Sequence, residues 1–401
     1  MRKLTFIPVL FVLLAGCSNN SKVGQSTQRI SVANKTADYL QLTSRQNENI
    51  IAWWVETDQK SGVKYVYFSR SRNSNLNFNS KNIIPASEGV NAGGEHMPKL
   101  VIKADGTYVL VFAIRNKDSN AQFASSVLYS QSFDEGKSWS EPALIHTDTD
   151  QDNSHGFPDV ILLPDGEVGA IWLDGRHHLD HSVIYFSKTD GKLGFGEDKR
   201  IGGPTCQCCK LDMYVDSDKI LHLVYRGLSQ NNIRDIMHLK STDNGASFSK
   251  PTRISKDNWK IMGCPHNGPS ITESDGELYI VWYTQGGEEG LYYAASEDDG
   301  DSFTARKKLA ESAMHPYVGS IGSTTVAVWD ERYKTEENVY RRIKLGHISS
   351  EGKIFINYIT SVSVEANAPY LSKLTNNESI ISWTQTTNNG HELYFQRKSE
   401  I

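Results

Sequence analysis

The sequence repeats itself, and this repetition constrains the fold more than any other feature. Three segments follow the pattern Ser-x-Asp-x-Gly-x-x-Trp/Phe: "SFDEGKSW" (132–139), "STDNGASF" (241–248) and "SEDDGDSF" (296–303). A degenerate copy, "SKTDGKLGF" (187–195), brings the spacing between copies to about 55 residues. In such a turn the Asp accepts backbone N–H groups and the Gly permits a positive φ. A period of this length suits four short strands per unit.

The repeated turn resembles the Asp-box of sialidases and other BNR-repeat β-propellers. The resemblance implies an all-β chain folded as a sialidase-like propeller of four-stranded blades. It carries over the fold and not the chemistry, because one fold can host many unrelated sites.

A second recurring phrase sets the expected number of blades. A short strand, often introduced by Pro as in "FPDVIL" or "HPYVGS", is followed by a polar turn such as "PDG" and an apolar strand such as "VGAIWL". Seven units can be counted, and the last, residues 366–400, lacks an outer strand. We expect "QRISVAN" (28–34) to supply that strand and close the ring, because a propeller covers its sheet edges. We therefore predict one propeller domain over residues 29–401 with seven blades, or six, as in sialidases, as the alternative.

The N-terminal segment has the features of a bacterial lipoprotein signal. Arg2 and Lys3 precede an apolar run, Leu4 to Leu14, that is too short to span a bilayer. The segment Leu14-Ala15-Gly16-Cys17 resembles the lipobox, and the resemblance implies cleavage before Cys17 and lipidation of its sulfur. The lipid would then hold the protein on a membrane.

The same resemblance defines the expected location. Residues 1–17 would comprise the signal peptide together with its lipobox cysteine, and 18–28 a flexible polar tether. Ser18, directly after the cysteine, favours sorting to the outer membrane, facing the periplasm. The net charge of −5 is too small to indicate nucleic acid as a partner.

Soft metal-binding side chains recur at one position of successive units. In a four-stranded antiparallel blade, the residues before the first strand and after the second share a face, opposite the Asp-box turns. Five units carry thiol, thioether or imidazole groups before the first strand. These residues are His96 and Met97, His155, Cys206 with Cys208 and Cys209, Cys264 with His266, and Met314 with His315. His177, His178 and His181 follow the second strand of the third unit.

Thiolate and imidazole together suit copper, especially Cu(I), with zinc as the alternative. The predicted ligands are Cys206, Cys208, Cys209, Cys264, His266 and His155. The predicted hydrogen-bond partners of these ligands are His96, His177 and His315. Two alternatives stay open: structural disulfides such as Cys206–Cys209 or Cys208–Cys209, and a reactive thiol without metal.

Charged groups at the ends of the second strands define another candidate site. Converging guanidinium groups could bind the carboxylate of a small molecule or glycan, or could pair with carboxylates of neighbouring blades. The candidate residues are Arg115, Arg176, Arg226, Arg332 and Asp174.

The sialidase resemblance implies three arginines on the substrate carboxylate, a Tyr–Glu nucleophile and an Asp acid/base. Arg115, Arg226 and Arg332 could mimic the arginines and Asp174 the acid. However, the family's Arg-Ile-Pro motif is absent from "ADYLQLTSR", and we assign no Tyr–Glu pair. Three functions therefore remain: copper handling or metal-dependent redox chemistry, exo-glycosidase action on acidic sugars, and glycan or protein binding without catalysis. The sequence does not decide whether the protein is an enzyme.

Overall fold

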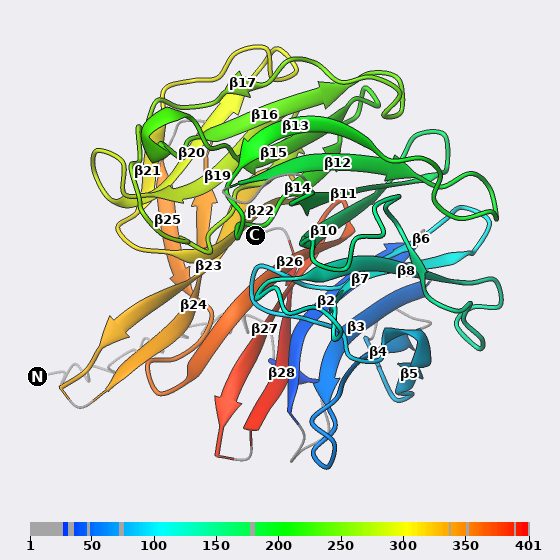
Figure 1. Cartoon of the computed structure of the whole chain (residues 1–401). Coiled ribbons are helices and arrows are strands. Elements are labelled where there is room, and N and C mark those ends of the chain that lie inside the picture. Colours follow the sequence, from blue (N-terminus) through cyan, green and yellow to red (C-terminus); the bar gives the residue numbers. More distant parts are fainter. Residues whose placement is uncertain are drawn as a thin grey trace, which may run out of the picture.

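The computed structural model describes residues 27–30, 36–45, 49–71, 76–176, 181–336, 338–349, 353–388 and 390–399. These residues form seven antiparallel sheets of four strands each, so the prediction of seven blades is confirmed. Figure 1 shows the blades arranged as a ring, with β10, β14, β22 and β26 near the middle and β5, β17 and β21 at the periphery.

The first three blades are continuous in sequence. Blade one comprises β2 (Ala37–Arg45), β3 (Asn49–Thr57), β4 (Lys64–Ser71) and β5 (Asn82–Ile84). Blade two comprises β6 (Lys99–Ile102), β7 (Tyr108–Arg115), β8 (Ser125–Ser132) and β9 (Ala143–Leu144). Blade three comprises β10 (His155–Leu162), β11 (Val168–Asp174), β12 (Ser182–Lys188) and β13 (Lys199–Thr205).

The next three blades repeat this order. Blade four comprises β14 (Asp212–Val215), β15 (Leu221–Arg226), β16 (Ile236–Ser241) and β17 (Thr252–Arg253). Blade five comprises β18 (Ser270–Ser274), β19 (Glu277–Thr284), β20 (Gly290–Ser296) and β21 (Lys307–Ala310). Blade six comprises β22 (Met314–Ile321), β23 (Thr324–Lys334), β24 (Val339–Ile348) and β25 (Ile354–Tyr358). Two 3-10 turns, η1 (Pro85–Ser87) and η2 (Gln230–Asn232), lie in connecting loops.

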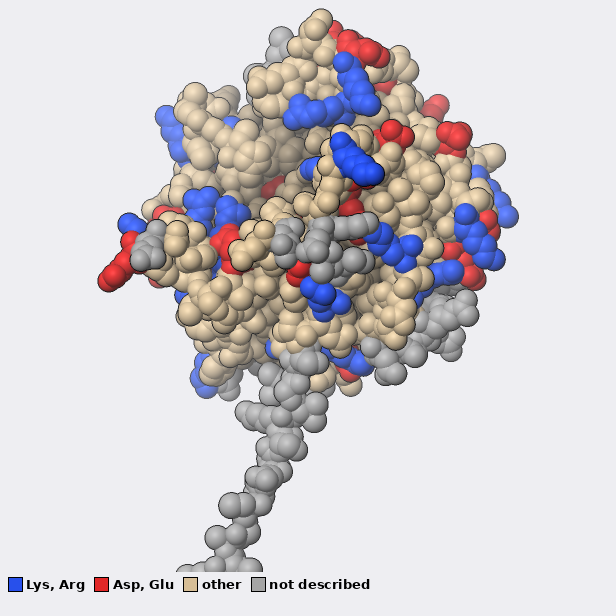
Figure 2. All heavy atoms as spheres, turned by 90° about the horizontal axis from the view of Figure 1, so that it is seen from below, with Lys and Arg blue, Asp and Glu red and all other residues tan. Residues whose placement is uncertain are grey.

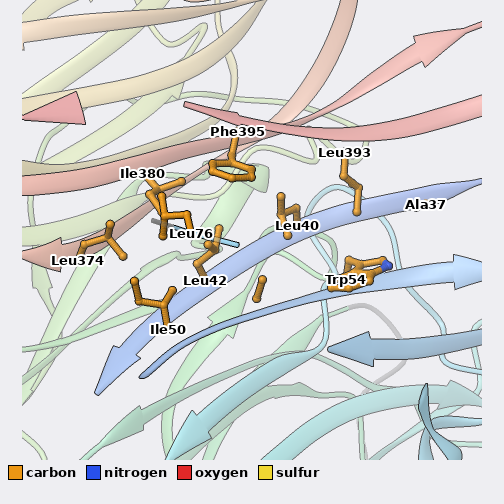
Figure 3. Close-up of a cluster of buried hydrophobic side chains, with 11 residues drawn as sticks. Ala37, Leu40, Leu42, Ile50, Trp54, Leu76, Leu374, Ile380, Leu393 and Phe395 are labelled. Atoms are coloured by element: carbon orange, nitrogen blue, oxygen red, sulfur yellow. The ribbon is translucent and has the colours of Figure 1, made fainter. Parts of the chain in front are cut away.

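Blade seven joins the two ends of the described chain. It comprises β26 (Glu365–Thr375), β27 (Glu378–Thr387), β28 (Gly390–Ser399) and, as its outer strand, β1 (Gln28–Arg29). Gln28 pairs with Phe395, so Gln28–Arg29 of the predicted segment 28–34 supply the outer strand, while residues 31–35 lie outside the described part of the chain. Figure 3 shows the apolar cluster behind this closure, in which Trp54 and Leu40 of blade one lie near Leu393 and Phe395 of β28.

The Asp-box turns fold as the sequence predicts. In the first copy, Asp134 Oδ1 accepts the backbone N–H of Ser138 at 2.9 Å, and Gly136 has φ +83°. Trp139 packs edge-on against Phe68 of the preceding blade, with ring centres 6.1 Å apart. The third copy places Phe303 against His238 of the preceding blade in the same way. Each turn therefore joins two blades as well as two strands.

Proline marks the point where the inner strands approach the axis. Phe157, His315 and Ala368 each adopt a positive φ, and each directly precedes a proline. The pairing register of their strands shifts at this point, which is a β-bulge that turns the strand.

The residues after these prolines, together with Lys99 after Pro98, form a buried polar centre. Lys99 Nζ lies 3.2 Å from Asp159 Oδ1 and 5.5 Å from the ring centre of Tyr370. The Tyr370 ring in turn lies 4.6 Å from that of Tyr317. These side chains come from blades two, three, six and seven, so polar groups meet where the blades converge.

The described surface is mixed in charge. On the face shown in Figure 2, blue Lys and Arg groups and red Asp and Glu groups are interspersed and form no large patch of one charge. Among the described residues, no helix has the length and apolar character needed to cross a membrane.

Candidate metal centre

Three cysteines meet in the loop between β13 and β14. The Sγ atom of Cys206 lies 3.5 Å from that of Cys208 and 3.5 Å from that of Cys209, and all three side chains are buried. The backbone N–H of Cys206 donates to the carbonyl of Arg226, the last residue of β15, at 2.9 Å. The cysteine loop therefore lies on the face where second strands end, as the blade geometry predicts.

A second donor group joins Cys208 to two residues of the loop before β18 in blade five, Cys264 and His266. One ligand atom each from Cys208, Cys264 and His266 lie within 4.8 Å of one another. Cys264 and His266 are exposed, whereas Cys208 is buried. All four of these cysteines are free thiols in the structure. We call Cys206, Cys208, Cys209, Cys264 and His266 together the donor cluster.

An arginine that the sequence analysis missed contacts this cluster. Arg234 Nη1 donates to Cys206 Sγ at 2.8 Å, and the Arg234 backbone N–H donates to the carbonyl of Trp259 at 2.9 Å. Arg234 lies between the second and third strands of blade four, on the face predicted for the donors. This loop position could have identified Arg234 from the sequence as a neighbour of the cysteines.

The three buried thiols have different acidities. Hydrogen bonds from the Cys208 and Cys209 thiols, and the neighbouring Arg234 guanidinium, lower the pKa of Cys206. The hydrogen bonds that Cys208 makes to Cys206 and Cys209 raise its own pKa, and burial raises that of Cys209. The proton-bearing groups thus surround one favoured thiolate, and the thiolate is the form that binds metals.

A buried carboxylate fixes the loops around the cluster. Glu95 Oε2 accepts the backbone N–H of Lys210 at 2.9 Å and that of Gly268 at 2.6 Å. The Lys210 Nζ atom donates to the carbonyl of Pro269 at 2.9 Å and lies 3.7 Å from the ring centre of Tyr317. Glu95 therefore links blade two to the donor loops of blades four and five. Its acidic side chain beside His96 in "GGEHMP" was a signal that we did not use.

Two of the predicted partner histidines are described. The His96 ring stacks on Phe157 with centres 4.6 Å apart, and Phe157 packs against the three buried cysteines. Burial lowers the pKa of His96 to about 4. His315 lies elsewhere on this face, where its Nδ1 is 2.6 Å from Asp330 Oδ1. Burial opposes the charge on His315, but Asp330 outweighs it and raises the pKa. His177 and His178 lie outside the described residues.

The structure does not bring His155 to the cysteines. Its Nδ1 lies 3.1 Å from the carbonyl of Ser125, its Nε2 lies 3.1 Å from Asp148 Oδ2, and its ring stacks on His146 at 3.8 Å. Among the described residues His155 belongs to neither donor group. Its loop position is equivalent to that of the cysteines, but its side chain faces a separate cluster formed by Ser125, His146 and Asp148.

The four candidate arginines lie in different surroundings. Arg226 is buried, and its Nη2 donates to the carbonyls of Asn267 at 2.8 Å and Tyr283 at 2.7 Å. Arg115 and Arg332 are exposed at the ends of their strands, and Arg115 Nη1 donates to a backbone carbonyl.

Arg176 forms ion pairs within its own blade. Its Nη2 lies 2.7 Å from Asp174 Oδ2 and also contacts Asp198. Burial opposes the positive charge, but these two carboxylates outweigh it and raise the pKa of Arg176. The expected pairing of arginine with carboxylate therefore occurs for Arg176, inside one blade and not between neighbours.

Comparison with known proteins identifies the family. A model described as "BNR repeat-like domain" matches residues 58–317, which is more than half of the chain. No curated protein matches the chain significantly.

Solved structures are similar to this chain at low identity. A protein of unknown function from Dyadobacter fermentans superposes with a TM-score of 0.51 at 15% identity, covering 78% of this chain and 97% of its own. A Hadza microbial sialidase gives 0.48 at 13%, covering 87% and 76%. A variant of the NanB sialidase from Streptococcus pneumoniae gives 0.48 at 10%, covering 93% and 92%. The chain belongs to the BNR repeat-like domain family, as a sialidase-like propeller of seven blades.

Proposed function

We propose that this protein is a lipid-anchored protein of the bacterial cell envelope that captures copper, as Cu(I), in the donor cluster. The observation that carries the proposal is the position of Cys208. Its sulfur lies 3.5 Å from Cys206 Sγ and within 4.8 Å of ligand atoms on Cys264 and His266. Four thiols and an imidazole from two neighbouring blades thus meet at one place.

The donor types favour copper over the other common metals. Thiolates select Cu(I), zinc and iron–sulfur clusters, whereas hard ions such as Mg²⁺ and Ca²⁺ take oxygen ligands. Each donor group offers three ligands, while a structural zinc site is closed by four. A group of three donors, most of them thiolates, suits the low coordination number of Cu(I). Zinc is the competitor that the experiment must include.

The cellular location follows from the lipobox, whose Cys17 lies outside the described residues. A lipid on Cys17 would keep the propeller at the membrane surface, where it meets copper ions that enter the envelope. Incorporation of a radiolabelled fatty acid into the wild type, and its loss in Cys17→Ser, tests this part independently of metal binding.

An anaerobic titration tests the copper proposal. The purified protein competes with the Cu(I) chelator bathocuproine disulfonate, and we expect it to withdraw copper from the chelator. Cys208→Ser should lose most of this affinity because Cys208 belongs to both donor groups. His347→Ala, a histidine on β24 of blade six, is the control and should bind like the wild type. A wild type that takes no copper from the chelator, or that prefers zinc, overturns the proposal.

The glycosidase alternative has less support from the described residues. Of the three arginines that could mimic the family's set, Arg226 donates to two backbone carbonyls and is not free for a substrate carboxylate. The candidate acid, Asp174, forms an ion pair with Arg176. We expect no hydrolysis of a fluorogenic sialoside. Hydrolysis by metal-free protein that persists in Cys208→Ser would favour the glycosidase instead.

A further inference from the structure

The two donor groups overlap at a single atom, the sulfur of Cys208. One group comprises Cys206, Cys208 and Cys209, and the other comprises Cys208, Cys264 and His266. We propose that the donor cluster holds two Cu(I) ions, an inner and an outer one, bridged by the Cys208 thiolate. This inference rests on the proposed function and specifies its stoichiometry and order of filling.

The distances within the cluster favour two positions over one. Two ligands of one ion lie at most twice the metal–ligand bond apart, which is about 4.6 Å for a metal–sulfur bond of about 2.3 Å. Within each group every pair of ligand atoms meets a similar limit of 4.8 Å. The five ligand atoms do not all lie within 4.8 Å of one another, because they form two groups and not one. At least one ligand atom of Cys206 or Cys209 is therefore farther than this limit from Cys264 or His266. A single ion therefore cannot contact all five residues without rearrangement.

The chemistry of a thiolate permits the bridge. A deprotonated sulfur has more than one lone pair and can bind two soft cations at once. The second ion brings one positive charge and recruits one further thiolate, that of Cys264, together with a neutral imidazole. The net charge of the cluster is then the same with one ion as with two. Arg234, which already donates to Cys206 Sγ at 2.8 Å, faces that charge in both states.

Burial sets the order in which the positions fill. The inner position has three buried thiols, against which Phe157 packs, so an ion there is shielded from water and competing ligands. The outer position has two exposed ligands, Cys264 and His266. The inner position should therefore fill first and release its ion slowly. The outer ion should bind more weakly and exchange faster with solvent or a chelator.

Native mass spectrometry of protein loaded anaerobically with excess Cu(I) tests the inference. We expect two copper ions on the wild type and on His347→Ala. Cys264→Ser and His266→Ala should each retain one ion, because they remove only the outer position. Both substitutions are at exposed residues, so loss of folding is not expected, and circular dichroism checks this. X-ray absorption of the two-copper form should show a copper–copper scattering path that is absent from Cys264→Ser.

The outcomes separate this inference from the proposed function. One copper ion on the wild type overturns the bridged pair and leaves copper binding intact. Complete loss of copper in Cys264→Ser also overturns it, because it would show one mixed site. Two ions retained in Cys264→Ser would show that the outer position lies elsewhere. No copper on the wild type overturns both proposals.

Discussion

Arg234 donates a hydrogen bond from Nη1 to the sulfur of Cys206 at 2.8 Å. The contact joins the loop after the second strand of blade four to the loop before its first strand. It places a permanent positive charge beside Cys206, whose sulfur also accepts a hydrogen bond from the Cys209 thiol and lies 3.5 Å from Cys208 Sγ. The guanidinium therefore stabilises the thiolate whether or not a metal is bound.

Removing that charge should weaken copper binding. We expect Arg234→Gln to lower the affinity for Cu(I) by about tenfold, because a charge-assisted hydrogen bond contributes roughly 1.5–3 kcal/mol and glutamine can restore part of it. The competition titration measures the change. Arg253→Gln, which removes an arginine paired with Asp235 in the same blade, should leave the affinity unchanged. Equal losses in both variants would contradict the assignment.

The reactivity of the thiols should follow their burial. Cys264 is exposed and Cys206, Cys208 and Cys209 are buried, so a thiol reagent should modify one cysteine quickly and three slowly in the native mature protein. Peptide mapping identifies the fast site, and Cys264→Ser should abolish the fast phase. Loading with Cu(I) should protect all four thiols. Rapid modification of more than one cysteine in the native protein would contradict this expectation.

Two glycines with similar backbones should tolerate alanine differently. Gly300 in the third Asp-box has φ +80° and Gly276 has φ +78°, but a Cβ at Gly300 would overlap the His238 ring, whereas a Cβ at Gly276 meets nothing within 4 Å. Gly276→Ala should cost about 1–2 kcal/mol in the free energy of unfolding from the left-handed conformation alone. Gly300→Ala should cost about 1–3 kcal/mol more because of the overlap. Denaturant unfolding of both variants measures the difference, and equal costs would contradict it.

Buried histidines should make stability depend on pH. Burial lowers the pKa of His146 to about 4 and that of His238 to about 3. The unfolded chain, with a histidine pKa of about 6.5, binds more protons than the folded protein between these values. The contribution of these two neutral histidines to the free energy of unfolding is therefore complete above about pH 6.5. It is lost as the pH falls, by up to about 1.4 kcal/mol per pH unit for each histidine.

Urea unfolding between pH 7.5 and pH 4.5 checks this dependence. The free energy of unfolding should depend less steeply on pH in His238→Gln, because unfolding of this variant takes up to about one proton fewer. The same substitution at His391, which is partly exposed and lies 2.7 Å from Asp38, is the control for a surface histidine. An unchanged slope in His238→Gln would contradict the prediction.

The sequence predicted the architecture well because the architecture is local and repeated. The Asp-box at 132–139 and the proline before Asp159 each determine a turn from a few adjacent residues, and the register of the blades follows. The face shared by the cysteines was predictable for the same reason, since it depends only on strand order.

Contacts between distant loops were not predictable in this way. Glu95 reaches Lys210 and Gly268 across 115 and 173 residues, and Arg234 reaches Cys206 across 28. Such pairs depend on the curvature of the ring and on side-chain rotamers, which no repeat specifies. His155 shows the same limit, because a loop position equivalent to that of the cysteines did not determine where its ring points.

The pairing of Gln28 with Phe395 has a consequence for how the molecule is made. The ring cannot close until β28 has been synthesised, because blade seven takes its outer strand from β1, which precedes blade one in the sequence. Contacts this distant in sequence slow folding. Blades one to six each contain four strands from one stretch of sequence, but the ring that they form stays open until β28 pairs with β1.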